Sequence, residues 1–292
     1  VVAMEWAQAL AVAKPLLGLG VAMMWSGVLT LALDLYTRTL ISRTLGVDAA
    51  GIYQAAWALS GLFAGFVLGA MGTDFYPRLT SVVHDRVAAV RAVNEQTEIG
   101  ILLAVPGLLA TLAFAKWVVW ALYSAQFAPA ADVLVWMVLG VFGRVLSWPM
   151  GFIQLAMGAG RLYMVTEATF LAIQASLAAW LVPMHGVIGA AYAFALCYLF
   201  YTAGMAWVGH RLIGFRWSPS VLRMMVVSST LMCCALGAYQ LLPDHVAMLL
   251  GGLLTLVGSV WSLRGLAERL GTTHRVVHWM RRFPLLRFVA GA

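Results

Sequence analysis

Residues 129–157 read PAADVLVWMVLGVFGRVLSWPMGFIQLAM, an apolar stretch whose only charges are Asp132 and Arg144. A helix that crosses a bilayer needs about 20 mostly apolar residues, so this stretch is long enough to span a membrane. Similar stretches recur along the whole chain. We therefore expect about eight transmembrane helices, with boundaries accurate to a few residues, at 16–41, 50–72, 99–123, 129–157, 161–182, 186–209, 222–242 and 246–263.

The composition of the whole chain is that of a membrane protein. Of its 292 residues, 63% are hydrophobic and 10% are charged, whereas a soluble globular domain has about 45–50% apolar and about 25% charged residues. This excess of apolar residues excludes a soluble enzyme, a disordered chain and a fibrous repeat. The apolar runs are continuous, which favours helices over the short alternating segments of a transmembrane barrel. We predict an all-α, polytopic membrane protein.

The distribution of lysine and arginine predicts how the chain is oriented. Cytoplasmic loops of membrane proteins carry an excess of these residues. If the N-terminus is cytoplasmic, the outer loops hold only Arg43, and the inner side holds Lys14, Arg78, Arg86, Arg91, Arg161, Arg211, Arg216, Arg223, Arg264, Arg269, Arg275, Arg281, Arg282 and Arg287. We therefore predict that both termini are cytoplasmic. The same rule assigns the net charge of +7 to inner loops rather than to nucleic-acid binding.

Two polar stretches are predicted to lie outside the bilayer. Residues 73–98 are expected to form a cytoplasmic loop with a short amphipathic helix. Residues 265–292 form a basic tail with interleaved aromatic residues such as Trp279 and Phe283. The tail is interpreted either as a solvated segment or as a helix on the anionic inner leaflet, and its pattern favours the helix.

The first apolar stretch carries Ser26, Thr30, Asp34 and Arg38, each four residues from the next. This spacing places the four side chains in one stripe on a helix. Asp34 and Arg38 are spaced to form an ion pair, which would make the stripe self-neutralising. Alternatively, the stripe lines a water-filled cavity, and Arg38 is available to an anionic ligand. Charges within a bilayer cost at least about 2.5–3.5 kcal/mol, so the second interpretation is favoured.

The stretch 129–157 contains a deeply placed cation and a proline. Arg144 lies about 20 Å from the inner end of the predicted helix, which is too far for its side chain to reach the interface. Arg144 is therefore expected either to form an ion pair inside the bundle or to face a central cavity. Pro149 removes a backbone hydrogen bond and predicts a kink, with Gly151 beside it as part of a hinge. The residues expected to share the face of Arg144 are Ser147, Gly151, Gln154 and Gly158.

Further polar residues occupy the neighbouring predicted helices. Glu167 lies near the inner end of the fifth one, with Gln174 on the same face. Glu167 is expected to reach the cytoplasmic interface, to carry a coupling proton, or to pair with a basic residue across the cavity. Lys116 is predicted to anchor its helix at the outer interface. Arginine suits bidentate contact with phosphate, so Arg38 and Arg144 predict an anionic, phosphate-bearing substrate. A drug-cation exporter would more naturally line its cavity with carboxylates and aromatic rings.

The sequence shows no catalytic or metal-binding signature. It contains no P-loop, HExxH, GxSxG or paired acidic motif, and Cys197, Cys233 and Cys234 lie in apolar runs without ligand spacing. His274 and His278 are four residues apart but have no neighbouring cysteine or carboxylate pair. We predict a protein that is not an enzyme and that binds no metal or cofactor, apart from a coupling ion, H⁺ or Na⁺.

Three stretches resemble a known transporter family. They are LISRTLGVDAAGIYQAAWALSGLFAGFVLGAMGTDFYPRL at 40–79, QFAPAADVLVWMVLGVFGRVLSWPMGFIQLAMGAGRLYMVTE at 126–167, and HGVIGAAYAFALCYLFY at 185–201. The second holds the ordered set Gln126, Phe127, Trp136, Gly140, Arg144, Ser147, Trp148, Pro149, Gly151, Ala156, Gly158 and Glu167. Over about residues 16–210 the chain resembles the C-terminal half of bacterial O-antigen flippases, the Wzx-type exporters of the multidrug/oligosaccharidyl-lipid/polysaccharide (MOP) superfamily.

The resemblance implies a fold and a function. Such flippases have two six-helix lobes around a central cavity and move undecaprenyl-diphosphate-linked oligosaccharides from the cytoplasmic to the periplasmic leaflet by alternating access. It implies a multi-pass protein of the bacterial inner membrane that acts in O-antigen and lipopolysaccharide synthesis. Its partners would be membrane lipids, the lipid-linked substrate and a polysaccharide polymerase, with no nucleic acid. Cavity arginines and lysines hold the diphosphate in such flippases, which implies this role for Arg38 and Arg144. With the polar faces described above, the predicted substrate site comprises Thr30, Asp34, Arg38, Arg144, Ser147, Gln154, Glu167 and Gln174, with Pro149 and Gly151 as the hinge.

The resemblance also divides the chain. It implies a six-helix lobe over 1–212, two additional transmembrane helices over 213–264 and the basic tail over 265–292. The N-terminal lobe would be absent, so the chain is expected to be part of a protein of about fourteen helices and not to transport alone. The alternatives are a lipid II flippase, a cation-coupled multidrug exporter, a membrane-embedded polysaccharide polymerase or ligase, and a non-transporting scaffold. The short outer loops disfavour the polymerase or ligase.

Overall fold

The computed structural model describes residues 6–270, and within them all side chains except those of 6–16, 63, 70, 73 and 270. This part of the chain is entirely helical apart from short connections. Its helices are α1 (Trp6–Leu45), α2 (Val47–Val82), α3 (Arg86–Leu122), η1 (Ala125–Phe127), α4 (Ala130–Ala156), α5 (Gly160–His185), α6 (Ile188–Ile213), α7 (Pro219–Leu241) and α8 (Asp244–Leu270).

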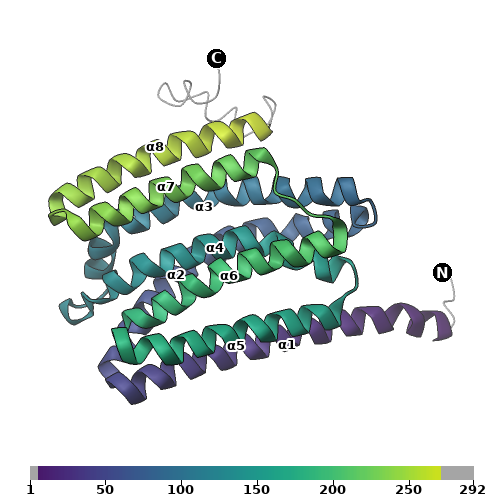
Figure 1. Cartoon of the computed structure of the whole chain (residues 1–292), viewed down its shortest axis with the longest axis horizontal. Helices are drawn as coiled ribbons and strands as arrows, with labels where there is room; N and C mark the ends of the chain where they lie inside the picture. The colour runs from purple at the N-terminus through teal and green to yellow at the C-terminus, as the bar shows by residue number, and fades with distance from the viewer. Residues whose placement is uncertain (1–5, 271–292) are drawn as a thin grey trace.

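The eight α-helices run alternately up and down because their connections are short (Figure 1). All eight are long and apolar enough to cross a membrane, which confirms the predicted all-α, polytopic fold. The predicted cytoplasmic position of both termini stays a prediction. Residues 271–292, which contain most of the predicted basic tail, lie outside the described residues, while 265–270 belong to α8.

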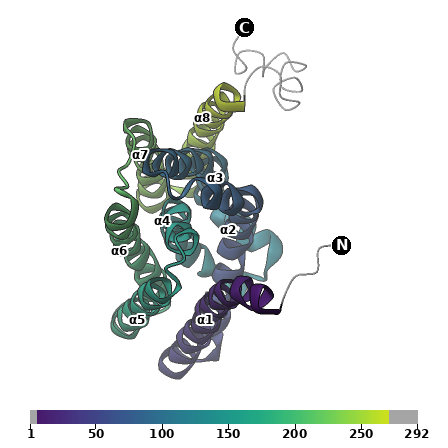
Figure 2. The same ribbon diagram turned by 90° about the vertical axis from the view of Figure 1, so that its right-hand side faces the viewer.

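Helix α4 lies at the centre of the bundle (Figure 2). It packs against α2, α3 and α6, and among the described spans it has the most buried window. Helices α1 and α5 lie together on one side, and α7 and α8 pack on α3 at the other (Figure 1). Fully buried leucines of α3, such as Leu108 and Leu112, join Leu134 and Met137 of α4 in the main core. The central helix α4 thus contacts α5 of the first group and α3, on which the second group packs.

The prediction that 73–98 form a loop is wrong, while the cytoplasmic position of this stretch stays a prediction. Helix α2 continues to Val82 and α3 begins at Arg86, so that only a tight turn separates them. The Asp85 carboxylate accepts hydrogen bonds from the backbone N–H groups of Val87 and Ala88 and thereby caps α3. Most charged residues of this stretch are exposed, whereas Asn94, Gln96 and Thr97 are buried. The buried faces of the two helices contribute to a second core, which contains Phe75, Leu79, Ala89, Ala92 and Val93.

Helix α8 packs on α3 through glycines spaced seven residues apart. A Cβ atom at Gly251 would lie 2.7 Å from Ala113 Cβ, and one at Gly258 would lie 2.5 Å from Leu109 Cδ1. A Cβ at Gly265 would lie 2.9 Å from Leu102 Cδ2. These glycines let the two helices approach closely, as small residues do in membrane bundles.

The Gly251→Ala change is expected to destabilise the protein. The added methyl group would also lie 3.0 Å from the Ala113 Cα atom, and backbone gives way less readily than a side chain, so we expect a loss of about 1–3 kcal/mol. The matched control is Gly252→Ala, whose Cβ would meet only Phe114 Cζ at 3.6 Å. Thermal unfolding in detergent should show a lower Tm for the first variant alone. Equal Tm values for the two variants would contradict the close packing.

Candidate functional site

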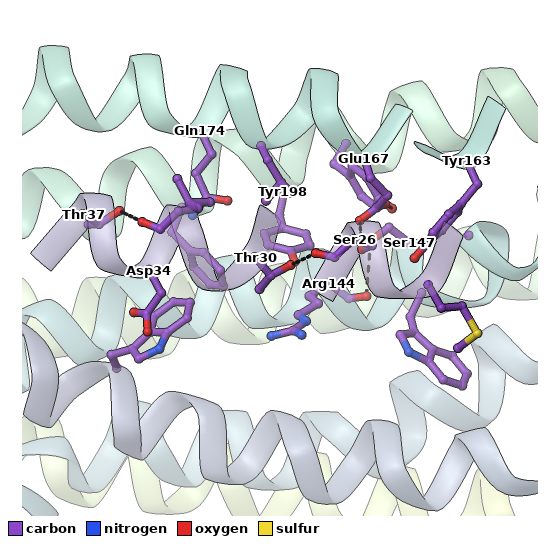
Figure 3. A pocket seen from close by; sticks show the side chains of 18 of the residues that line it. Ser26, Thr30, Asp34, Thr37, Arg144, Ser147, Tyr163, Glu167, Gln174 and Tyr198 are labelled. Atoms are coloured by element: carbon purple, nitrogen blue, oxygen red, sulfur yellow. Dashed lines mark hydrogen bonds between the residues drawn. The ribbon is translucent and has the colours of Figure 1, made fainter. Parts of the chain in front are cut away.

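A cavity of about 260 Å³ opens between α1, α2, α4, α5 and α6 (Figure 3). Polar residues of three of these helices line it together with aromatic residues. The polar lining consists of Ser26, Thr30, Asp34 and Thr37 of α1, Arg144 and Ser147 of α4, and Glu167 and Gln174 of α5. The structure therefore brings together six of the eight residues that the sequence assigned to the substrate site.

Helix α1 provides one wall of the cavity. Ser26, Thr30 and Asp34 all line the cavity, as their four-residue spacing predicts. The Thr30 hydroxyl donates to the carbonyl oxygen of Ser26 at 2.8 Å, so its hydrogen is satisfied within the helix. The stripe thus faces a polar space.

Arg144 extends from α4 into the same space. In Figure 3 its side chain points toward the space that Thr30 and Asp34 also face. The residue is partly buried, and no described residue forms an ion pair or a hydrogen bond with its guanidinium group. The neighbouring Ser147 hydroxyl donates to the carbonyl oxygens of Gly143 and Arg144. Arg144 therefore offers an unpaired cation, which a cavity-facing role requires.

Arg38 is placed differently. Its guanidinium forms an ion pair with Asp34 at 2.7 Å and a second hydrogen bond to the same carboxylate at 3.1 Å. The side chain of Arg38 is 41% exposed and is not part of the cavity lining. The geometry corresponds to the self-neutralising pair, the interpretation that the sequence favoured less.

Gln154 lies outside the cavity as well. It is fully buried, its Oε1 accepts a hydrogen bond from the Thr166 hydroxyl at 3.1 Å, and its Nε2 lies 3.6 Å from Met205 Sδ. Gln154 therefore joins α4 to α5 and α6. The predicted hinge residues are split, because Gly151 lines the cavity and Pro149 is buried within an uninterrupted α4.

Glu167 connects three helices at the edge of the cavity. Its carboxylate accepts a hydrogen bond from the Ser26 hydroxyl of α1 at 3.0 Å and another from the Tyr201 hydroxyl of α6. Among the described residues, no lysine, arginine or histidine lies within ion-pair distance of it. Gln174 lines the cavity two helical turns further along α5. The basic partner considered from the sequence is therefore not found in the described part of the chain.

The sequence reasoning missed the aromatic side of the cavity. Its aromatic lining consists of Tyr53, Trp57, Trp148, Phe152, Tyr163, Phe194, Tyr198 and Tyr201. Ring centroids of Trp57 and Phe194 lie 5.4 Å apart, and those of Phe194 and Tyr198 lie 4.9 Å apart, so a continuous wall joins α2 to α6. Three pairs in this set are spaced by four residues, a helical signal that the sequence already contained.

A comparison with protein families matches residues 2–132 to the family described as polysaccharide biosynthesis protein. Among curated proteins, the lipid III flippases of Escherichia coli (strain K12) and Shigella flexneri are each 24% identical over 169 residues. Each match covers 56% of this chain and 39% of the relative. The matched region thus spans well under half the length of these flippases.

Solved structures show the same fold. A MOP superfamily transporter from Pyrococcus furiosus has a TM-score of 0.59 at 14% identity, over 95% of this chain and 68% of that one. An outward-facing multidrug resistance transporter of the MATE family gives the same values. The named matches are transporters and flippases, in agreement with the prediction that the chain is not an enzyme. The family match and the lipid III flippase relatives agree with the predicted resemblance of this chain to polysaccharide flippases, and the solved structures show the fold alone.

Proposed function

We propose that the protein containing this chain moves a lipid-linked oligosaccharide from the cytoplasmic to the periplasmic leaflet of the bacterial inner membrane by alternating access. The observation that carries this proposal is the unpaired guanidinium of Arg144 in an aromatic cavity. Arginine binds phosphate oxygens in a bidentate manner, so Arg144 would hold the diphosphate. The aromatic wall would contact the apolar faces of sugar rings.

The size of the cavity agrees with a binding site that is formed by two lobes together. Pockets for drug-sized ligands enclose about 300–1,000 Å³, and the cavity formed by the described residues has about 260 Å³. This volume suits a headgroup more than a complete oligosaccharide. We propose that a second lobe, outside this chain, completes the site. In this proposal 1–212 form one lobe, 213–264 add α7 and α8, and 265–292 form the basic tail.

The finer assignments belong to the same proposal. The substrate would be an undecaprenyl-diphosphate-linked repeat unit of O-antigen or another polysaccharide, handed over to a polymerase. The cytoplasmic end of the bundle would be the one that carries the α2–α3, α4–α5 and α6–α7 connections, because Arg86, Arg161 and Arg216 lie there. A coupling ion, H⁺ or Na⁺, would act through Glu167.

A cation-coupled multidrug exporter is the second candidate. The shared fold with a MATE transporter and the combination of aromatic rings with Glu167 in one cavity favour it. Arg144 opposes it, because an unpaired guanidinium repels a cationic drug. A lipid II flippase differs from the leading proposal only in the glycan carried.

Depletion of the full-length protein in its native bacterium distinguishes these candidates. We expect polyprenyl-diphosphate-linked glycans of several sugars to accumulate on the inner leaflet, measured by mass spectrometry and by lectin access in inverted vesicles. A plasmid copy of the gene should reverse the accumulation. Accumulation of lipid II alone would move the assignment to peptidoglycan synthesis. If neither accumulates, lipid-linked sugars are not the substrate, and small-molecule export becomes the function to test.

A further inference from the structure

A second cavity, of about 890 Å³, lies at the other side of the bundle from α1 and α5. It is formed where α3 ends and where α4 and α8 begin, and it shares no lining residue with the cavity of Arg144. This end of the bundle carries the α1–α2, α3–α4, α5–α6 and α7–α8 connections, which the distribution of lysine and arginine assigns to the periplasm. The volume falls in the range of small-ligand pockets.

Two tryptophans give this cavity its apolar surface. Trp117 and Trp120 lie one turn apart on α3, with ring centroids 5.8 Å apart and planes at 79°. They are 56% and 68% exposed. Tryptophans at this depth commonly anchor a helix at the membrane interface. Here, however, they share their cavity with Asp132, Asp244 and His245, so their faces border a polar space as well.

Both carboxylates of the cavity already hold one hydrogen-bond partner. Lys116 Nζ donates to Asp244 Oδ1 and forms an ion pair with it, and the same ammonium lies 5.1 Å from the centre of the Tyr239 ring. The Tyr239 hydroxyl in turn donates to Asp132 Oδ1 at 2.7 Å. Each carboxylate therefore uses one oxygen in these bonds, and in the described part of the chain its second oxygen has no hydrogen-bond partner.

This arrangement selects the chemistry of a ligand. Two carboxylates against one ammonium leave the lining with a net negative charge when His245 is neutral, which disfavours phosphates and acidic sugars. The free carboxylate oxygens are acceptors only, and sugar hydroxyls are donors that match them. The apolar C–H face of a pyranose ring fits against an indole ring, whose face carries partial negative charge. Neutral or amino-bearing sugars meet all three conditions.

We propose that this cavity is a binding site for a neutral or amino-bearing saccharide. Trp120 and Trp117 would stack on the sugar rings, and Asp132 and Asp244 would accept hydrogen bonds from the hydroxyl groups. The site goes beyond the proposed flippase function, because it lies away from the cavity of Arg144 and needs neither a diphosphate nor transport. A phospholipid headgroup is the competing occupant.

Binding to the purified full-length protein in detergent tests this site without any transport step. The probes are the neutral trisaccharide of N-acetylglucosamine, its deacetylated amino form and phosphoethanolamine, titrated by calorimetry. We expect saturable binding of at least one of the two saccharides. Trp120→Ala should weaken it roughly tenfold or more, and Asp132→Asn should weaken it less, since asparagine keeps one oxygen acceptor.

The matched control is Trp180→Ala. Trp180 of α5 is 62% exposed and lies a similar distance from the same end of the bundle, but it does not line this cavity. Its replacement should leave saccharide affinity unchanged. The proposal is overturned if neither saccharide binds, if both tryptophan variants lose affinity equally, or if phosphoethanolamine alone binds. Because the readout is binding, a failure of the flippase proposal would leave this result intact.

Discussion

Export of lipid-linked oligosaccharide will fall roughly 10- to 150-fold when Arg144 is replaced by alanine in the full-length protein, because hydrogen bonds to charged groups contribute about 1.5–3 kcal/mol. No described residue pairs with this guanidinium, so its removal leaves no buried charge behind. Arg144→Lys should recover only part of the activity, since an ammonium lacks the planar fork of donors. Export is measured as the loss of lectin-accessible glycan from the outer surface of inverted vesicles, normalised to the amount of folded protein from size-exclusion profiles.

Arg38→Ala is the control for this prediction. Arg38 lies on the wall helix α1, but its side chain is 41% exposed, is paired with Asp34 and does not itself line the cavity. Exposed ion pairs contribute about 0–1 kcal/mol, so export should change little. If Arg38→Ala abolishes export and Arg144→Ala does not, the phosphate site is wrongly placed and the stripe on α1 binds the substrate instead.

Glu167→Gln will produce the second large effect, an export rate at or below roughly a tenth of the wild-type rate that no longer responds to an imposed ion gradient. Glutamine retains an oxygen that accepts a hydrogen bond from Ser26 or Tyr201, so the contacts between α1, α5 and α6 are largely preserved. What is lost is the capacity to bind a proton or a sodium ion as a carboxylate. Transport into proteoliposomes under separate proton and sodium gradients measures the dependence.

Glu95→Gln is the control for Glu167→Gln, because it also removes one carboxylate but lies outside the cavity. Glu95 of α3 is exposed, and its Oε2 lies 3.6 Å from Nη1 of Arg78 on α2, so its replacement should leave gradient dependence intact. Ser26→Ala separates structure from coupling, because it removes the bridge from α1 without removing the carboxylate. Should Glu167→Gln keep full gradient dependence, Glu167 only holds α1 against the bundle.

The apolar stretches predicted the helices well because their length and continuity depend on the chain alone. Residues 73–98 were misassigned because a helix that continues beyond the hydrocarbon region exposes a polar face. Only the packing of α2 and α3 in the tertiary structure, which buries Leu79 and Val93 in one core, shows that this stretch is helical. The turn at Asp85 needs just one capping carboxylate, a weak signal beside many charged residues.

The candidate site was predictable where local helix geometry decides it. Ser26, Thr30 and Asp34 share a face at four-residue spacing, and all three line the cavity. Gln154 lies ten residues after Arg144, and at 100° per residue its side chain is rotated by about 80° around the helix axis from that of Arg144. The face that the sequence analysis assigned to Arg144 was therefore drawn too wide. The partners of Gln154 on α5 and α6 come from tertiary packing, which the spacing within α4 does not encode.

The seven-residue glycine spacing on α8 has a consequence for measurements of movement. Gly251 and Gly265 leave too little space for α8 to slide along α3 without collision. In any cycle that opens and closes the cavity beside α1, the pair α7 and α8 should therefore travel with α3 as one rigid body. Spectroscopic labels on the exposed faces of α3 and α8 would then keep a constant distance from each other. This distance would serve as an internal reference for measuring displacements of α1.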